Sequence, residues 1–346
     1  MKRISTFLFL FICFIAQAQQ AYYNGIDFTK RGIPLKEDLA NLITSTHRRT
    51  LSYGDLWYAL KITDIDPTNS TRVIQLYGYN RNSTGNDAYY NGKDNNGGNV
   101  SEWNREHTFA KSLGSPNLGE SGPGADAHHL RASNVQRNST RGNLLFAAGS
   151  GNSAKSNGGW YPGDEWKGDV ARMMMYMYLR YGNRCKPTAV GYGSSANTPD
   201  DMIDLFLQWN AEDPVSQIEI QRNEYLGTTQ NSYGQGNRNP FIDNPYLATL
   251  IWGGPTAENK WASLSTNDNY VNTKNNVEVY NDQSNVTVKS SSDNIKTISV
   301  FNINGQLIKN VNVNAKSFKL TQLTKGAYIL KIDGEHFTET KKVIVK

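Results

Sequence analysis

The sequence changes character near residue 265, and this change predicts two separately folding units. Residues 265–346 contain eleven Lys, seven carboxylates and no Arg, which gives this tail a net charge of +4. Residues 19–264 carry −1, so the formal charge of +5 on the whole chain comes from the tail and from Lys2 and Arg3. The overall basicity is therefore no evidence that the body of the chain binds nucleic acid.

The tail is filled with short runs in which apolar and polar residues alternate. Such alternation predicts strands with one buried face, and clear examples lie at residues 277–280, 286–288, 298–301 and 328–332. Asn304-Gly305 separates two runs and is a strong hairpin signal. We expect a small β-sandwich of about seven short strands.

The N-terminus has the pattern of a secretory signal. A charged start precedes an apolar run at residues 7–15, and Ala16-Gln17-Ala18 offers small residues to a signal peptidase. The run is too short to span a membrane, although a buried N-terminal helix is an alternative. We predict that residues 1–18 are removed from an exported, soluble protein. Cys13 would leave with them, so Cys185 would be the only thiol and the fold would contain no internal disulfide.

The body of the chain, residues 19–264, shows both helical and extended patterns. Apolar residues recur at helical spacing after Pro34, and Asp169 to Tyr181 is apolar almost all round, which is typical of a central helix. Helices are predicted at residues 35–43, 53–60, 134–145, 169–181, 202–209 and 214–224, and extended segments at 73–77 and 100–109. A short strand or turn is predicted at 127–130, and loops at 78–99, 114–124 and 149–163. We therefore expect one α+β domain.

Residues 103–143 hold most of the side chains that could carry chemistry. Three of the five His lie here, within Trp103-Asn104-Arg105-Glu106-His107 and Asp126-Ala127-His128-His129-Leu130, and Asn138 and Arg141-Gly142-Asn143 follow. A hard divalent cation takes oxygen ligands such as Glu and the Asn carbonyl. His can deprotonate a water near neutral pH, and Arg binds phosphate.

A strand with Glu-His, a loop, a second short strand with His and a helix with Asn together form the ββα-metal finger of several nuclease families. In such a site Glu106 and Asn138 would hold a metal that keeps most of its water, which suits Mg²⁺. His107 would deprotonate an attacking water. Neighbours on an extended segment point to opposite sides. A twist or bulge, or a side chain reaching in from the rim, must therefore bring Glu106 and His107 to one site.

The window resembles the endonuclease I family of secreted bacterial nucleases. The family pattern is a Trp-Asn-Arg-Glu-His block, then Asp-x-His-Asn-Leu, then Asn-x-x-Arg-x-Asn. This chain has Trp103 to His107, Asp126 to Leu130, and Asn138, Arg141 and Asn143 at matching spacing. Further matches are Lys167 to Arg172, Tyr176-Met177, Trp209, Asp213 to Val215 and Gln235 to Asp243, so that the resemblance covers about residues 22–253.

The resemblance implies a ββα-metal (His-Me finger) nuclease domain that hydrolyses phosphodiester bonds of DNA and RNA with little sequence preference. His107 would be the general base, and Glu106 with Asn138 would hold Mg²⁺, or else Ca²⁺ or Mn²⁺. His128 would support the catalytic site, and Arg141 would assist at the phosphate. The side chains expected to bind substrate are Arg105, Lys111, Arg137, Arg141 and Asn143.

The window departs from the family at two places. His129 stands where the family commonly has Asn. Family members that carry a catalytic Arg in a disulfide-linked insertion between the two motifs have no counterpart here, because residues 108–130 contain no Arg. We expect Lys111 or Arg141 to supply that positive charge.

The tail resembles the C-terminal sorting domain of type IX secretion substrates. The matching residues are Val300 to Gln306, Leu323 to Tyr328 and the closing Lys341 to Lys346. The resemblance implies recognition by an outer-membrane secretion machinery and a secreted or surface-held protein. A carbohydrate- or surface-binding β-module is the alternative for this segment.

Taken together, these patterns favour an exported, metal-dependent endonuclease acting on DNA and RNA, which we expect to be a monomer. One alternative is a cell-surface protein that binds glycans through its many Tyr and Trp without catalysis. A zinc half-site at His128-His129 lacks a third soft ligand nearby. A glycosidase would need two paired carboxylates, and the sequence marks out no such pair.

Overall fold

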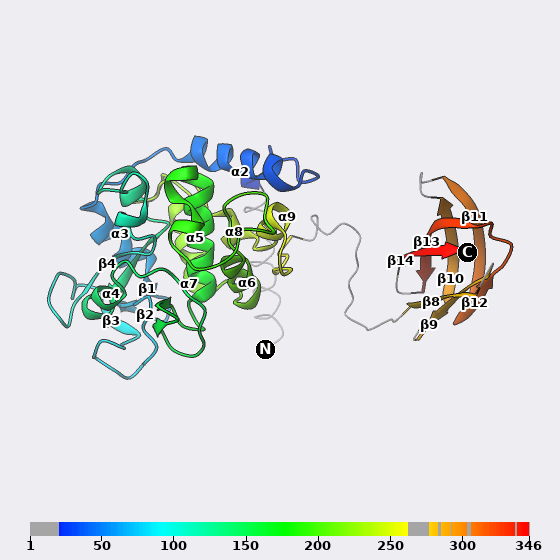
Figure 1. Cartoon of the computed structure of the whole chain (residues 1–346). Helices are drawn as coiled ribbons and strands as arrows, with labels where there is room; N and C mark the ends of the chain where they lie inside the picture. The colour runs from blue at the N-terminus through cyan, green and yellow to red at the C-terminus, as the bar shows by residue number, and fades with distance from the viewer. Residues whose placement is uncertain are drawn as a thin grey trace, which may run out of the picture. The chain divides into compact units, whose positions relative to one another are not determined.

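The computed structural model describes residues 21–261 and, in the tail, residues 277–345 except 283–284, 292, 303–305 and 336–337. The chain divides into two compact units, Met1–Leu264 and Ser265–Lys346 (Figure 1). The predicted signal peptide and the Asn304-Gly305 turn lie outside the described residues. None of the helices in the described part of the chain combines the length and apolar character needed to cross a membrane.

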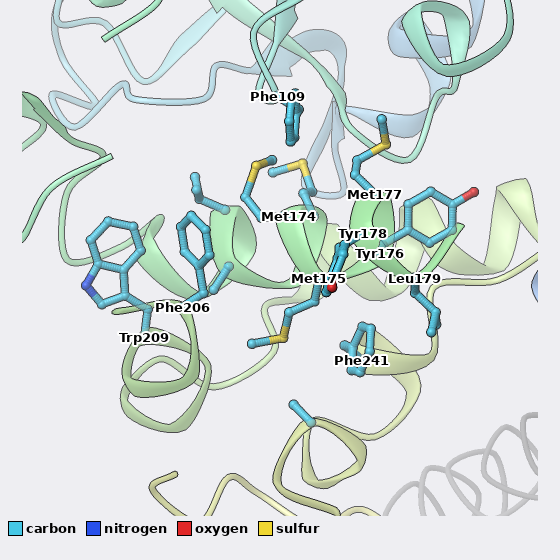
Figure 2. Close-up of a cluster of buried hydrophobic side chains, with 14 of the residues drawn as sticks. Phe109, Met174, Met175, Tyr176, Met177, Tyr178, Leu179, Phe206, Trp209 and Phe241 are labelled. Atoms are coloured by element: carbon cyan, nitrogen blue, oxygen red, sulfur yellow. The ribbon is translucent and has the colours of Figure 1, made fainter. Parts of the chain in front are cut away.

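Helix α5, Lys167–Tyr181, lies at the centre of the first unit. All of its residues from 168 to 179 are buried, as the apolar pattern around the whole helix predicts. It contacts α2 (Gly32–Thr46), α6 (Asp204–Glu212) and α8 (Pro240–Asp243). Figure 2 shows the methionines of α5 among aromatic side chains from other elements. The helix is therefore the core around which the unit is built.

The other elements of this unit are short. The remaining helices are α3 (Asp55–Thr63), α4 (Val135–Arg141), α7 (Gln217–Leu226) and α9 (Tyr246–Trp252), with 3-10 turns at Lys111–Leu113, Gly122–Ala125, Gly182–Cys185 and Pro187–Ala189. The strands form three small antiparallel sheets: β1 (Ile65–Asp66), β2 (Asn69–Ile74) and β3 (Tyr90–Gly92); β4 (Trp103–His107) and β5 (Leu130–Asn134); and β6 (Ala154–Ser156) and β7 (Gly159–Tyr161).

The described part of the tail contains seven strands in two antiparallel sheets. One sheet has the order β11-β10-β13-β14 and the other β12-β9-β8. Their bounds are β8 Val277–Asp282, β9 Asn285–Ser290, β10 Ile295–Asn302, β11 Leu307–Ala315, β12 Ser317–Leu320, β13 Gly326–Gly334 and β14 Thr338–Val345. Alternate residues such as Val286 and Val288 of β9 and Leu330 and Ile332 of β13 share one apolar core. The predicted fold class, a mixed domain followed by an all-β one, is confirmed.

The predicted element boundaries differ from the observed ones where polar residues are buried. Residues 127–130 were expected to form a short strand or a turn; residues 127–129 form a turn, and the second strand of the motif lies at Leu130–Asn134. All five of its residues are buried, among them Arg131 and Ser133, so it lacks the alternation that marks a strand. Helix α4 ends before the predicted residue 145 because Gly142 has a φ of 55°, a left-handed conformation that stops a helix.

A cluster of buried charges fixes β5 to the core. Arg131 forms ion pairs with Asp64 at 3.3 Å and with Asp169 of α5 at 3.1 Å. Asp64 also accepts a hydrogen bond from the Ala132 amide at 2.6 Å and pairs with Arg222 of α7. Each charge is paired, as burial requires. The strand therefore has one position relative to α5 and α7.

The turn that precedes β5 is held by buried polar groups. The Asp126 carboxylate accepts hydrogen bonds from the hydroxyls of Tyr176 and Tyr181, both at 2.8 Å. His128 donates from Nε2 to the Asn237 carbonyl, and His129 donates from Nε2 to the Pro123 carbonyl. Burial lowers the pKa of both imidazoles to about 4, against the opposing charge of Asp126, so both are neutral at pH 7.

We predict that His129→Asn, which introduces the family's residue, makes the protein more resistant to acid. The unfolded chain takes up a proton on His129 near pH 6.5, whereas the folded chain does so only near pH 4. The folded state therefore loses stability as the pH falls through this window. Between about pH 7.5 and about pH 5 the variant should gain about 2 kcal/mol relative to the wild type. Urea unfolding of both proteins at the two pH values measures this. A stability difference between variant and wild type that is the same at both pH values would contradict the prediction.

Candidate active site

The motif residues form a strand–strand–helix unit. Strand β4 pairs with β5 in a regular antiparallel register in which Trp103 lies opposite Asn134 and His107 opposite Leu130. Helix α4 follows β5 directly and contacts both strands. The Asn134 side chain starts the helix by accepting hydrogen bonds from the amides of Gln136 and Arg137. The ββα arrangement expected from the sequence is therefore present.

A cleft of about 490 Å³ opens at the C-terminal end of β4. It is lined by Arg105, Glu106, His107, Ala110, Lys111, Ser112, Asn117, Asn138, Arg141, Gly142 and Asn143. Glu106 and His107 both line it although their register with β5 is regular, so of the alternatives expected from the sequence the bulge does not occur. Within the described part of the chain, this sheet has only two strands, which leaves the outer edge of β4 unpaired beyond Trp103. Side chains from the two faces of β4 can therefore meet at this edge.

Glu106 lies deep in the cleft, with 2% of its surface exposed. Its Oε1 accepts a hydrogen bond from the Tyr77 hydroxyl at 3.0 Å and lies 3.4 Å from Nη1 of Arg141. Burial raises the pKa of Glu106 to about 7, although Arg141 and Tyr77 oppose the rise. Among the described residues, no hydrogen-bond donor binds its Oε2, so that oxygen is available to a cation.

Asn138 on α4 faces the same cleft. Its Nδ2 donates to Oδ1 of Asn104 at 2.8 Å, which leaves its own Oδ1 as the available acceptor. Across the described ranges, no three His, Cys, Asp or Glu side chains gather into a metal-binding group. One carboxylate and one amide oxygen form a sparse, hard donor set, which fits a divalent cation that keeps most of its water.

His107 presents one ring nitrogen to the cleft. Its Nε2 lies 2.9 Å from the Gly124 carbonyl, which can only accept, so Nε2 carries the proton and Nδ1 is the basic atom. Residue 124 must be a glycine, because a Cβ at this position would lie only 2.0 Å from the Gly119 carbonyl oxygen. Burial, aided by the neighbouring His129, lowers the pKa of His107 to about 3. The imidazole is therefore neutral at pH 7, with Nδ1 unprotonated.

The three cations that line the cleft differ in their partners. Arg141 is buried and donates to the carbonyls of His107, Thr108 and Gly142. It thus joins the end of β4 to α4. Lys111 is partly exposed and pairs with Glu120 at 3.1 Å. Arg105 lies against two aromatic rings.

Seven of the nine residues expected to act at the site line the cleft: Glu106, His107, Asn138, Arg105, Lys111, Arg141 and Asn143. Arg137 does not, because its guanidinium binds Ser153 and lies near the rings of Tyr79 and Trp160. Helix spacing alone does not exclude Arg137, since it lies four residues before Arg141 and Asn138 lies three before it; the contacts with Ser153 are what hold Arg137 away from the cleft.

His128 is the other expected residue outside the cleft. Its ring centroid lies 4.4 Å from that of Tyr176, and its Nε2 binds the Asn237 carbonyl. The ring next to His107 is that of His129, at 5.7 Å between centroids. The structure thus places His128 in the turn before β5, outside the cleft, and the expectation that it supports the catalytic site stays a prediction. The two neighbouring His bind different carbonyls and do not form a zinc half-site.

Sequence reasoning missed three residues that contact the site. Alternation along β4 could have placed Asn104 on the same face as Glu106. Tyr77 and Tyr53 come from other elements, and no local pattern connects them with the motif.

Comparison with known proteins identifies both units. Residues 31–246 match the family model of endonuclease I, and residues 271–346 match that of the secretion system C-terminal sorting domain. The chain is 43% identical to the extracellular ribonuclease of Bacillus subtilis (strain 168) over 244 residues, 67% of this chain and 78% of the relative. It is also 43% identical to that of Bacillus amyloliquefaciens over 236 residues, 64% of this chain and 75% of the relative.

These matches decide between the alternatives. The sorting domain confirms the predicted export tail of the type IX kind and a secreted or cell-surface location, in place of a carbohydrate-binding module. The nuclease match confirms an enzyme that hydrolyses nucleic acid, in place of a glycan-binding protein without catalysis. Because the family model spans more than half of the sequence, the chain belongs to the endonuclease I family.

Proposed function

We propose that this secreted nuclease is a metal-dependent endonuclease that hydrolyses RNA and DNA with little sequence preference, and that it acts as a monomer. The observation that carries the proposal is the meeting of three groups in one cleft: the basic Nδ1 of His107, the buried carboxylate of Glu106 and the amide oxygen of Asn138. These are the groups that phosphodiester hydrolysis by a ββα-metal site requires.

In the proposed reaction, Nδ1 of His107 takes a proton from a water molecule. The oxygen of that water forms a bond to phosphorus, and the bond from phosphorus to the leaving oxygen breaks. The leaving oxygen departs with the electron pair and takes up a proton from solvent. Glu106 and Asn138 would hold Mg²⁺, or alternatively Mn²⁺ or Ca²⁺, which when bound would stabilise the charge on the phosphate and the leaving oxygen.

The range of substrates follows from the polar groups of the cleft. Lys111 and Arg105 can contact the sugar-phosphate backbone, which every nucleic acid shares. The names of the two Bacillus relatives support RNA as one substrate. Binding through phosphates also implies affinity that falls as salt rises.

We predict that His107→Ala lowers cleavage of both plasmid DNA and single-stranded RNA by roughly 10²- to 10⁴-fold, because a positioned general base contributes that much. The unfolding temperature and circular dichroism should show that the fold is kept. Supercoiled plasmid and a labelled RNA, each assayed with Mg²⁺ and with EDTA, provide the measurement. A fully active variant would exclude His107 as the base.

We predict that Glu106→Gln weakens binding of Mg²⁺ or Mn²⁺ by at least roughly tenfold, since loss of even an outer partner of a metal site costs that much. The matched control is Glu165→Gln, a partly exposed carboxylate that pairs with Arg81 outside the cleft. Metal-dependent shifts of the unfolding temperature report binding without reference to activity. If the metal shifts the unfolding temperature equally in both variants, Glu106 is not a metal ligand. If the wild type cleaves nucleic acid in EDTA, the reaction does not depend on a metal.

A further inference from the structure

The cations of the cleft are not equally available to a substrate. Arg141 already donates to three carbonyls and lies beside Glu106. Lys111 is paired with Glu120. Arg105 forms no ion pair with any carboxylate among the described residues. Of the three, its charge is the one that no protein anion compensates at close range.

Arg105 is nevertheless held in place. Its Cζ lies 3.6 Å from the ring centroid of Tyr53 and 4.0 Å from that of Trp57. Its Nη1 donates to the Tyr53 carbonyl. Its Nε is buried without a hydrogen-bond partner, and its Nη2 donates to no group among the described residues. Nη2 of a fixed guanidinium is thus left for a ligand that lies in the cleft, and the buried Nε beside it has no protein partner that would compete with such a ligand.

The position of Arg105 relative to His107 suits one phosphate group. The two residues are separated by one position in β4, so their side chains leave the same face of the strand about 6–7 Å apart. Tyr53 contacts both, because its ring is stacked with that of His107 at 5.5 Å between centroids. A phosphodiester attacked by a water on Nδ1 of His107 would therefore lie within reach of the Arg105 donors.

We propose that Arg105 is the catalytic cation of this site, with Nε and Nη2 donating to non-bridging oxygens of the phosphate as negative charge builds up in the transition state. Tyr53 and Trp57 act as positioning residues that keep its plane fixed. Arg105 would then supply the positive charge that some family members obtain from an Arg between the two motifs. The inference rests on the proposed function, and no bond forms or breaks at Arg105.

Three variants separate this role from a structural one. Arg105→Met keeps an unbranched apolar chain between the two rings but removes the charge. Arg105→Lys keeps a charge but lacks the planar donors. Arg105→Ala leaves a slot between Tyr53 and Trp57 that a free guanidinium ion can enter. Arg81→Ala is the matched control, because Arg81 also lies over a tyrosine ring, 3.8 Å from the centroid of Tyr89, outside the cleft.

We predict that kcat falls by roughly 10²- to 10³-fold in Arg105→Met and Arg105→Ala, as on removal of other transition-state donors. KM should change far less, Arg105→Lys should be intermediate, and Arg81→Ala should match the wild type. Guanidinium at about 50 mM should restore part of the kcat of Arg105→Ala alone, with sodium chloride as the ionic control. Tyr53→Leu should lower kcat less than loss of Arg105 does.

The outcomes are distinct. An unchanged kcat in Arg105→Met, or an effect seen only as a raised KM, overturns the inference. The proposed function still stands in that case, provided that the wild type cleaves nucleic acid. The inference is also overturned if kcat falls in every variant in proportion to the fall in its unfolding temperature, because such a correlation indicates a structural role for Arg105. A wild type that cleaves neither RNA nor DNA overturns the proposed function itself.

Discussion

The buried charge of Arg131 is the constraint on which the geometry of the site depends. Its guanidinium has 1% exposure and would be very unfavourable there without Asp64 and Asp169. Those partners lie after α3 and on α5, and Asp64 in turn pairs with Arg222 on α7. Because β5 has one position in this cluster, the register that sets Glu106 opposite Arg131 also sets how deep the Glu106 carboxylate lies in the cleft.

The cluster also explains how an exported fold manages without cross-links. Cys185 is the one cysteine of the described residues, and its burial raises the pKa of its thiol to about 12. Such a thiol is unreactive. The first unit is held instead by the all-round burial of α5 and by paired charges between helices and strands. The strands of the tail use a separate apolar core, and the groups proposed to act in catalysis all belong to the first unit.

The parts of this site that the sequence predicts are those carried by short-range periodicity. The Glu-His pair, the helix face shared by Asn138 and Arg141 and the alternating strands of the tail each follow from spacing along the chain. Local spacing does not show that Arg137 and His128 lie outside the cleft, because their partners, Ser153 and Asn237, are on distant segments. Tyr53 and Tyr77 were missed for the same reason. Strand β5 lay beyond its predicted range because polar pairing, rather than apolar alternation, explains its burial.

The open edge of β4 has a consequence for how such a site can change. The carboxylate and amide lie on one side of the strand with α4, whereas the imidazole lies on the other side against Tyr53 and the Gly124 carbonyl. The half proposed to hold the cation and the half proposed to accept the proton thus have mostly different neighbours, although Arg141 contacts both, through Glu106 and the His107 carbonyl. Substitutions that avoid Arg141 can therefore change the metal preference of one half or the basicity of the other while leaving the other half's contacts in place.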